Sequence, residues 1–302
     1  MDWRVKVAVQ FALGQCPGGW WLNAKLSDLY RGMGELRGLV RQRASEVAWA
    51  ERSGLCIEGA QVVEIGTGRW PVAALLLSLL GARTVDTYDR RPLLDRKSLR
   101  SIVSEFEILS DELAILLGRP REMLACRLRW LREVLGGSDL LEAGHIRYHA
   151  PAETARTRLP DRSTDALVSF DVFEHLRPDL LASLQSEARR LIRPGGCQFH
   201  TIGLGDHYGG VDGRLTSVNF LRYPDRWWDF FTGNELSYHN RLRWPQYLDL
   251  LNGHGFQVVS RNLTTDLPAL EALRTMKLDR RFCELSPNDL AIARATVLAQ
   301  RV

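Results

Sequence analysis

The sequence predicts an α/β protein with a seven-stranded, mostly parallel sheet that carries helices on both faces. From Gln61 onward, short apolar segments alternate with segments of helical periodicity, which is the pattern of strand–helix–strand units. The first apolar segment runs into a turn at Gly66 and Gly68 and then into a helical pattern. With 45% hydrophobic and 25% charged residues, the composition is that of a globular protein, and it excludes disordered, collagen-like and coiled-coil chains.

Length, charge and cysteine content narrow the class further. A chain of 302 residues leaves one or two domains open, and a net charge of +4 is too small to indicate a nucleic acid partner. The five cysteines include no Cys-x-x-Cys pair, which argues against a disulfide framework or a thiolate zinc site and favours a reducing compartment. The N-terminal segment lacks the cleavage pattern of a signal peptide, and the longest apolar run, residues 72–80, is shorter than the ~20 residues that span a bilayer. We therefore expect a cytoplasmic protein without a membrane partner.

The chain is expected to form an N-terminal helical cap at residues 1–57 and a main domain at 58–302. The cap has apolar residues at helical spacing, at Leu26, Leu29, Tyr30 and Met33. Strands of the main domain are predicted at 61–65, 83–88, 145–149, 165–170, 196–203, 256–263 and 290–299. Helices are predicted near 71–81, 178–192 and 244–253, with Gly81 and Gly255 at their ends and a turn at 194–196 before the fifth strand.

Two stretches of the main domain are too long to be simple connections. Residues 90–144 have helical periodicity and five arginines in their second half, which predicts one or two inserted helices with a solvated basic face. Residues 205–243 are rich in glycine and aromatic side chains and follow the end of a strand, where ligands of open α/β sheets bind. We therefore expect this second insertion to act as a lid over a substrate site.

The turn after the first strand carries the sharpest chemical signal. Glycines at 66 and 68 allow a tight bend and a close approach of a ligand to the backbone. Asp89 ends the next strand, where its carboxylate can accept hydrogen bonds from ribose hydroxyls. Pro71 stands where a dinucleotide fingerprint has its third glycine, and the carboxylate of Glu64 repels a pyrophosphate but suits an ammonium group. The pattern favours a nucleoside with a cationic amino-acid tail over NAD.

At this point the chain resembles the class I S-adenosylmethionine-dependent methyltransferases, which have a Rossmann-like fold. The segment from Glu64 to Gly68 is similar to the first motif of that family, and Asp89 matches the acidic second motif. Residues 151–153 resemble the segment that contacts adenine, 165–176 the fourth motif, and 191–196 the turn before the fifth strand. The chain departs from the family at Arg69-Trp70-Pro71 and in the long insertion before the third strand.

The resemblance implies S-adenosylmethionine as cofactor and S-adenosylhomocysteine as product. Carried over position by position, it implies a set of cofactor-binding residues: Glu64, Gly66, Thr67, Gly68, Asp89, Ala152, Glu153 and Asp171. Segments at 17–23, 66–71, 205–208 and 240–243 also resemble a bacterial branch of the superfamily, and that resemblance implies no substrate.

Histidines after the strand ends are the candidates for catalysis. Methyl transfer from a sulfonium is an in-line displacement in which the protein aligns the reactants and excludes water. An oxygen or nitrogen nucleophile must lose a proton, so His207, oriented by Asp206, and His175 are candidate general bases. His175 could instead orient the following helix, and the Asp206-His207 pair could cap a loop. His200 lies inside a predicted central strand, where a core histidine is expected.

The second insertion supplies the candidate substrate-binding residues, which are Tyr208, Trp227, Trp228 and Arg241. The aromatic side chains could wall a pocket or pack the insertion onto the sheet. Arg241 could grip a carboxylate or a phosphate, and a surface salt bridge is the plainer alternative for it and for Arg243. No recognisable ligand spacing indicates a metal, so none is expected.

The predicted function is methyl transfer to a small molecule, at an oxygen of a sugar or a secondary metabolite. N- or carboxyl-methylation of a peptide or amine is an alternative, which the arginines of the first insertion would help to recruit. Nucleic acid is disfavoured because residues 171–174 read Asp-Val-Phe-Glu and lack the Asn/Asp-Pro-Pro-aromatic signature of base methylation. A domain that binds S-adenosylmethionine without methyl transfer remains open, as does the choice between monomer and homodimer.

Overall fold

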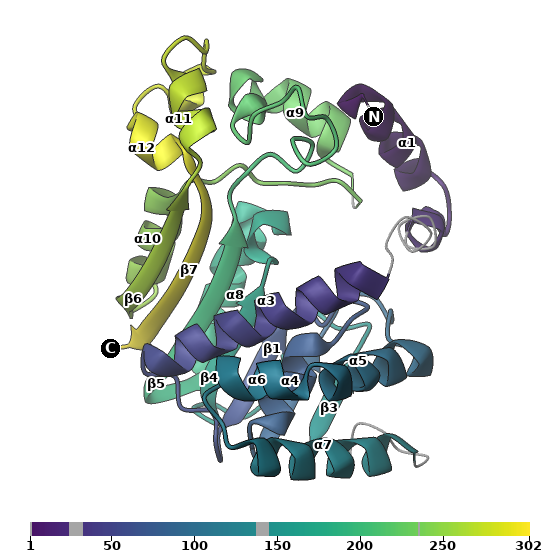
Figure 1. Cartoon of the computed structure of the whole chain (residues 1–302). Helices are drawn as coiled ribbons and strands as arrows, with labels where there is room; N and C mark the ends of the chain where they lie inside the picture. Colours follow the sequence, from purple (N-terminus) through teal and green to yellow (C-terminus); the bar gives the residue numbers. More distant parts are fainter. Residues whose placement is uncertain (1, 24–32, 137–144, 235) are drawn as a thin grey trace.

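The computed structural model describes residues 2–23, 33–136, 145–234 and 236–302 (Figure 1). Its strands are β1 (Gln61–Ile65), β2 (Thr84–Tyr88), β3 (Ile146–His149), β4 (Thr164–Phe170), β5 (Ile192–Gly203), β6 (Phe256–Thr265) and β7 (Ile292–Arg301). The longer helices are α1 (Trp3–Gln15), α3 (Met33–Arg52), α4 (Val72–Leu79), α5 (Arg96–Ile108), α7 (Arg121–Gly136), α8 (Pro178–Leu191) and α10 (Trp244–Gly253). Shorter helices are α6 (Ser110–Leu116), η1 (Phe173–His175), η2 (Asn219–Arg222), α9 (Asp225–Thr232), α11 (Leu267–Leu273), η3 (Arg280–Phe282) and α12 (Pro287–Leu290).

The seven strands form one sheet in the order β3-β2-β1-β4-β5-β7-β6. Every neighbouring pair from β3 to β5 is parallel, and β7 runs antiparallel to both β5 and β6. The predicted seven-stranded, mostly parallel sheet is thus confirmed. Ile65 at the end of β1 pairs with Tyr88 of β2 and Ser169 of β4, so the carboxyl ends of these strands meet at one edge.

Helices cover both faces of the sheet because alternate strand residues point to opposite sides. Val62 belongs to an apolar core shared with α3, α4, α5, α6 and α7. Val63 and Ile65 belong to the opposite core, which is shared with α8 and α10. A third apolar cluster joins Val7 of α1 to Trp228 of α9 and Phe282 of η3, away from the sheet. Figure 1 shows this upper group of helices on the side of the sheet's carboxyl edge.

The two described helices of the predicted cap, α1 and α3, pack against different parts of the molecule. α3 packs against the sheet through Val40, Ala44 and Val47, whereas α1 packs against α9. Leu26, Leu29 and Tyr30 lie outside the described residues, so the helix expected there stays a prediction, as do the domain limits at 57 and 58.

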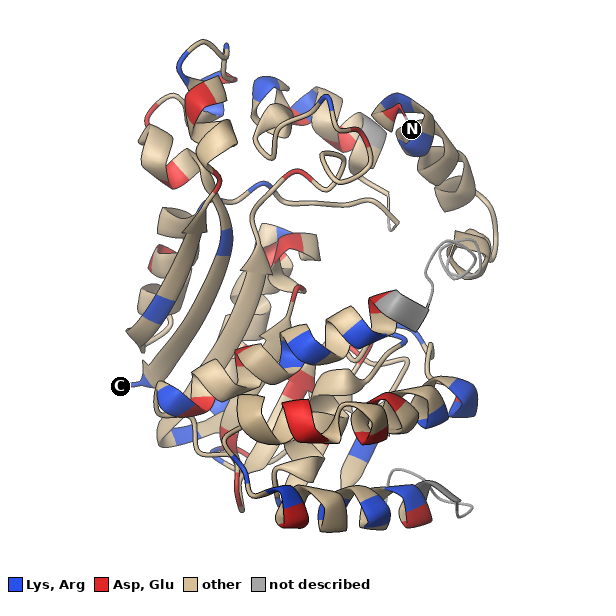
Figure 2. Ribbon diagram, viewed as in Figure 1, with Lys and Arg blue, Asp and Glu red and all other residues tan. Residues whose placement is uncertain are grey.

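The first insertion is helical as predicted, with three helices, α5, α6 and α7, instead of one or two. Its arginines form ion pairs with acidic neighbours: Arg119 with Glu51, Arg121 with Asp111, Arg127 with Glu58 and Arg132 with Glu107. Figure 2 shows Lys and Arg interspersed with Asp and Glu along these helices. The basic residues of this insertion therefore lie on a surface of mixed charge.

One predicted turn is wrong. Residues 194–196 were expected to separate a helix from a strand, but β5 already begins at Ile192, which pairs with Thr164 of β4. The register then shifts, and pairing resumes between Ala166 and Cys197. Gly195 has a φ of +78°, which lets the extra residues bulge within the strand. Among the described residues, no helix is both long enough and apolar enough to cross a membrane.

Candidate functional site

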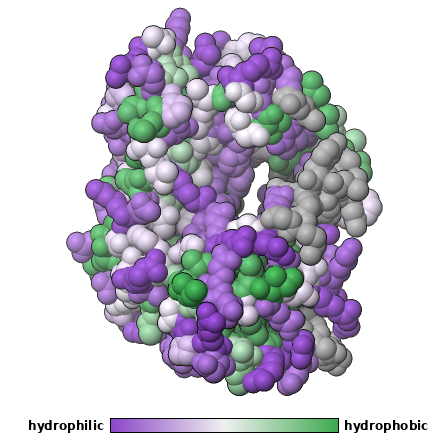
Figure 3. All heavy atoms as spheres, viewed as in Figure 1, coloured by the Kyte–Doolittle hydropathy of each residue, from purple (hydrophilic) through white to green (hydrophobic). Residues whose placement is uncertain are grey.

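A cavity of about 890 Å³ opens where the carboxyl ends of β1, β2 and β4 meet. Its wall includes all of the predicted cofactor-binding residues: Glu64, Gly66, Thr67, Gly68, Asp89, Ala152, Glu153 and Asp171. The same wall includes His175, one of the candidate bases. Figure 3 shows a hollow on this side of the molecule, bordered mainly by hydrophilic residues. The cavity is within the size range of cofactor sites.

The turn between β1 and α4 needs glycine at two positions. Gly66 and Gly68 have φ angles of +84° and +63°, in the left-handed region that side chains avoid. A Cβ atom on Gly66 would lie 2.4 Å from Cγ2 of Val172. The backbone N–H groups of Gly66 and Thr67 both donate to the carbonyl of Tyr88, at 2.8 and 3.2 Å. These contacts fix the turn against β2 and leave it open toward the cavity.

Asp89 is held at the mouth of the cavity by backbone donors. One carboxylate oxygen accepts from the N–H of Gly68 at 2.7 Å, and the other accepts from the N–H of Arg91 at 2.9 Å. A carboxylate has about four acceptor positions, so two remain for hydroxyl groups of a ligand. The geometry suits recognition of a vicinal diol such as a ribose.

Glu64 is buried at the end of β1, with 3% of its surface exposed. Its Oε2 accepts a hydrogen bond of 2.5 Å from the hydroxyl of Thr87, which also contacts the hydroxyl of Thr67 at 2.6 Å. Burial raises the pKa of Glu64 to about 7, and the Thr87 hydrogen bond and the charge of Arg43 oppose that rise. A ligand cation beside this carboxyl group would favour its ionised form.

Asp171 lies on the same wall, but arginines already engage both of its oxygens. Arg43 of α3 donates at 2.8 Å and Arg294 of β7 lies at 2.9 Å, and both arginines also pair with Glu46. Burial alone would raise the pKa of Asp171, and the two guanidinium groups outweigh it and lower that pKa. The network ties the end of β4 to α3 and β7, so Asp171 shapes the cavity wall.

Three histidines gather beside the cavity. The rings of His175 and His207 lie 5.0 Å apart between centroids, and His239 lies 4.5 Å from His207. The two predicted candidates are therefore brought together, and His239 is added to them. Its place in the second insertion was visible in the sequence, but no spacing pattern connected it to the other two.

His175 and His207 also line a second cavity of about 80 Å³, together with Lys6, Asp206 and Tyr208. Both rings keep solvent-exposed surface, and the protein atoms around them lower the pKa of His175 and lower that of His207 to about 4 by desolvation. The nearby His175 and Lys6 lower the pKa of His207 further. A lowered pKa favours the neutral imidazole, which has a ring nitrogen that can accept a proton.

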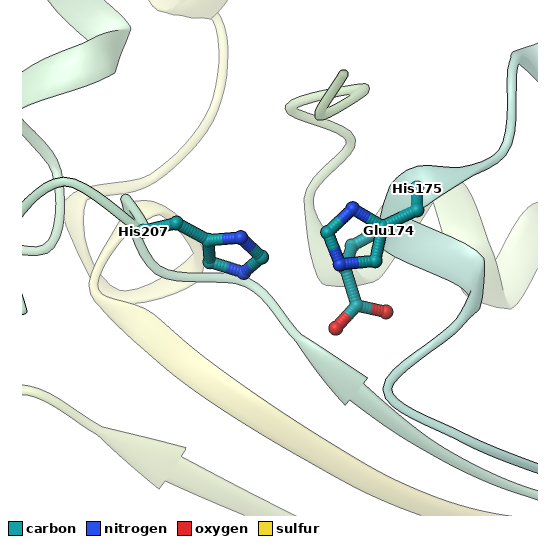
Figure 4. A group of neighbouring side chains, drawn as sticks. All are labelled: Glu174, His175 and His207. Atoms are coloured by element: carbon teal, nitrogen blue, oxygen red, sulfur yellow. The ribbon is translucent and has the colours of Figure 1, made fainter. Parts of the chain in front are cut away.

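Glu174 is a further functional candidate, which the sequence showed only as part of the fourth motif. The side chain is 1% exposed, and its Oε1 accepts from the N–H of Gly203 at 2.9 Å. Burial and the nearby charge of Asp171 raise the pKa of Glu174 to about 8. In Figure 4 the imidazole of His207 points toward Glu174 and His175.

The predicted role of Asp206 is wrong. Its Oδ1 accepts from the backbone N–H of Tyr208 at 2.8 Å, and in the part of the chain that the structure describes no hydrogen bond joins it to His207. Burial raises its pKa to about 6. Asp206 caps its own loop, which was the alternative reading, because the loop turns its carboxyl group back onto the chain.

Arg241 does not face a ligand. It is 1% exposed and donates to the carbonyl oxygens of Phe220 and Tyr223, at 2.8 and 2.6 Å, and it pairs with Asp225. Arg243 is buried too and donates to the carbonyl oxygens of Leu204, Leu290 and Ile292. Neither a ligand contact nor a surface salt bridge describes them; they hold the second insertion to the main domain.

The three aromatic candidates for substrate binding lie in two different environments. Tyr208 and Trp228 are buried and line the smaller cavity, and the Tyr208 hydroxyl contacts the Gln10 side chain of α1 at 3.2 Å. Trp227 is 51% exposed and lines neither cavity. His200 is a core residue as expected, bonded to Ser169 and Gln198 at 2.8 and 2.7 Å, and burial lowers its pKa to about 3.

Comparison with known proteins gives a family match. Residues 132–199, which reach from α7 to β5, match the family model of a methyltransferase domain. A search of curated protein sequences finds no match.

Several solved structures are similar to this chain. An S-adenosylmethionine-dependent methyltransferase from Mesorhizobium loti is 17% identical, with a TM-score of 0.47 over 85% of this chain and 98% of that one. Geranyl diphosphate C-methyltransferase from Streptomyces coelicolor A3(2) is 15% identical, with a TM-score of 0.47 over 86% and 79%. A methyltransferase from Methanosarcina mazei is 14% identical, with a TM-score of 0.45 over 84% and 97%.

Proposed function

We propose that the chain is a class I S-adenosylmethionine-dependent methyltransferase that methylates an oxygen atom of a small molecule, and the match of residues 132–199 to a methyltransferase domain supports this. The acceptor would lie between the larger cavity and the second insertion. One observation carries this proposal: His175 lines both cavities, so a group that can take a proton stands where a cofactor site and an acceptor site adjoin.

The larger cavity offers a partner for each part of the cofactor. The carboxylate of Glu64 would hold the ammonium of the methionine tail, and the backbone at Gly66 and Gly68 would let that tail approach closely. Asp89 would accept from the ribose hydroxyls, and Glu153 would face the adenine.

In the proposed reaction the neighbouring histidines accept a proton. A lone pair of the acceptor hydroxyl attacks the methyl carbon, the carbon–sulfur bond breaks, and its electron pair stays on sulfur as S-adenosylhomocysteine forms. The hydroxyl proton leaves to the histidine cluster of His175 and His207. The residues that line the smaller cavity would hold the acceptor in line with the methyl group.

The acceptor side of the site mixes aromatic and polar groups. Tyr208 and Trp228 supply apolar surface, and Lys6 and Gln10 of α1 supply a charge and an amide. This wall favours a polar acceptor with a ring, such as a sugar or a hydroxylated secondary metabolite. Carboxyl methylation is the second candidate, because the Lys6 ammonium can hold an acidic acceptor.

Binding of S-adenosylhomocysteine, measured by calorimetry, tests the proposal. We expect Glu64→Gln and Asp89→Asn to weaken binding about tenfold or more, since each removes a charge-assisted hydrogen bond. The matched control is Asp111→Asn, which neutralises an exposed carboxylate on α6. Failure of the unaltered protein to bind S-adenosylhomocysteine would contradict the cofactor site.

The proposed methyl transfer is tested by turnover of a panel of hydroxylated and acidic acceptors, with S-adenosylhomocysteine formation as readout. His207→Ala should cut turnover and leave the affinity for S-adenosylhomocysteine within about twofold, because His207 is not in the wall of the larger cavity. Binding of the cofactor product without turnover of any acceptor would favour a domain that binds without methyl transfer.

A further inference from the structure

A carboxylate and two imidazoles converge at the junction of the two cavities. One ligand atom each from Glu174, His175 and His207 lies within 4.8 Å of the others. Glu174 and His175 come from η1 after β4, and His207 comes from the loop after β5 (Figure 4). Such a set of two histidines and one carboxylate is a familiar donor set for divalent transition metals.

Independent of that convergence, the cluster contains buried polar atoms that lack a partner. Oε2 of Glu174 is buried and, in the part of the chain that the structure describes, accepts no hydrogen bond. Nδ1 of His239, which packs against His207, is also buried and unpartnered. Leaving a carboxylate oxygen buried without a partner is costly, and a cation beside it removes that cost.

Two of the three side chains are already oriented by contacts on their far side. Nδ1 of His175 donates to the carbonyl of Tyr238 at 3.0 Å, which leaves Nε2 as an acceptor. Oε1 of Glu174 is held by the N–H of Gly203 at 2.9 Å, which leaves Oε2 without a protein partner. Metal-binding histidines and carboxylates are typically positioned by hydrogen bonds of this kind.

We propose that Glu174, His175 and His207 bind one divalent transition-metal ion, with an open position that faces the acceptor. Bonds of about 2.1 Å in a tetrahedral arrangement would separate ligand atoms by roughly 3.4 Å, so an ion would draw together three atoms that lie within 4.8 Å of one another. Imidazole ligands favour Zn²⁺, Co²⁺, Ni²⁺ or Fe²⁺ over Mg²⁺ and Ca²⁺. This proposal departs from the expectation of no metal, which rested on ligand spacing in the sequence.

The ion would also set the chemistry of the step, and this part rests on the proposed function. The acceptor oxygen occupies the open position, and the metal lowers the pKa of its hydroxyl so that the proton leaves to solvent water. The oxygen then attacks the methyl carbon, and the electron pair of the carbon–sulfur bond stays on sulfur. In the metal-bound protein the two imidazoles are ligands, so this route replaces the proton transfer to His175 and His207 that the metal-free protein would use.

Metal binding is tested without any acceptor. The whole protein is stripped with a chelator, dialysed and titrated with Zn²⁺ by calorimetry and with Co²⁺ by visible absorption. We expect one ion per chain and a Co²⁺ spectrum of a nitrogen- and oxygen-ligated site. His207→Ala and Glu174→Gln should each weaken binding by more than the roughly 10- to 100-fold loss that follows removal of an outer-shell partner.

The matched control is His145→Asn, which removes an exposed histidine outside the cluster and keeps a residue that tolerates its positive φ. Binding that is unchanged in His207→Ala, or lost equally in His145→Asn, would overturn the site. Affinity for S-adenosylhomocysteine, measured on each variant, shows that the variant is folded.

The two proposals fail separately. Binding of S-adenosylhomocysteine without specific metal binding overturns the metal site and leaves the methyltransferase site standing. Full turnover by the metal-free protein overturns the role of the metal in the step, even where the ion binds.

Discussion

The carboxyl group of Glu64 lines the larger cavity, and its buried surroundings shift its pKa strongly. Its folded pKa of about 7 lies above the ordinary value of 4.5, so its ionisation costs the folded protein stability as the pH rises through this window. A ligand ammonium beside the carboxylate removes that cost. Cofactor affinity and the charge of this one side chain are therefore linked.

From this linkage we expect the affinity for S-adenosylhomocysteine to rise about tenfold between about pH 5.5 and pH 7, as Glu64 becomes ionised in the free protein. Calorimetry across this range measures it, below the pH at which the ligand amine itself titrates. Glu64→Gln should bind more weakly and with a flat pH profile. A pH profile that is equally steep in this variant would assign the titration to another group.

At the residue scale, local patterns predicted the cavity wall well. Glu64, Gly66 and Asp89 stand at fixed places along a strand, a turn and the next strand, and the wall contains all three. Arg241 and Asp206 could not be assigned in this way, because their partners depend on how the second insertion folds back. Residue type alone does not distinguish an arginine that grips a ligand from one that grips carbonyl oxygens.

At the scale of elements, the turn from β1 to α4 is sensitive to a single methyl group. Gly66→Ala should lower stability by about 1–3 kcal/mol and weaken cofactor binding, since the new Cβ is both strained and 2.4 Å from Val172. Urea unfolding and calorimetry measure the two effects. Gly59→Ala is the matched control: its φ is +73°, no atom lies within 4 Å of the added Cβ, and cofactor binding should be unchanged.

The second insertion depends on Arg241 for its attachment. Arg241→Ala should lower the free energy of unfolding by about 3 kcal/mol or more, because it leaves two buried carbonyl oxygens without their donor and removes one of the two arginines paired with Asp225. Arg281→Ala removes the other, more exposed partner of Asp225 and should cost much less. If the Arg241 variant had normal stability and a raised KM for the acceptor, the result would support the earlier hypothesis that Arg241 binds the ligand.

The elements themselves were predictable where periodicity is strong. Alternation of strands and helices from β1 to β5 gave their order and nearly their limits, because β1, β2 and β4 are almost continuous buried runs. The bulge at 193–196 was not predictable, since Pro and Gly there have the same composition as a turn. The cluster of His175, His207 and His239 was only partly visible, because it forms from segments that meet across the insertion.

At the scale of the whole molecule, the chain's first helix contributes to the wall of the smaller cavity. α1 packs against α9, and of the described residues its Lys6 and Gln10 line the smaller cavity but not the larger one. The larger cavity is walled by the carboxyl edge of the sheet and by α3, whereas α1, α9 and the loops of the second insertion contribute to the smaller one. Under the proposed function, cofactor binding and acceptor binding would therefore belong to different parts of one chain.

This division predicts separable effects of substitution. The double variant Lys6→Ala/Gln10→Ala should keep the affinity for S-adenosylhomocysteine within about twofold and lower kcat/KM for the acceptor at least about tenfold. Calorimetry and steady-state kinetics give the two numbers. Lys97→Ala, on the exposed side of α5, should change neither. A parallel loss of cofactor affinity in the double variant would argue against the division.

The reversal of β7 has a practical consequence for handling the protein. Because β7 alone runs against the other strands, it starts beside Gly203 at the edge that holds the cavities and ends beside Cys197 at the far edge. Figure 1 accordingly shows the C-terminal residue at the opposite end of the molecule from α1. A tether attached after Val302 would leave the mouth of the site facing solvent, whereas one attached before α1 would hang over it. Immobilisation on a sensor surface for ligand screening should therefore use the C-terminal end.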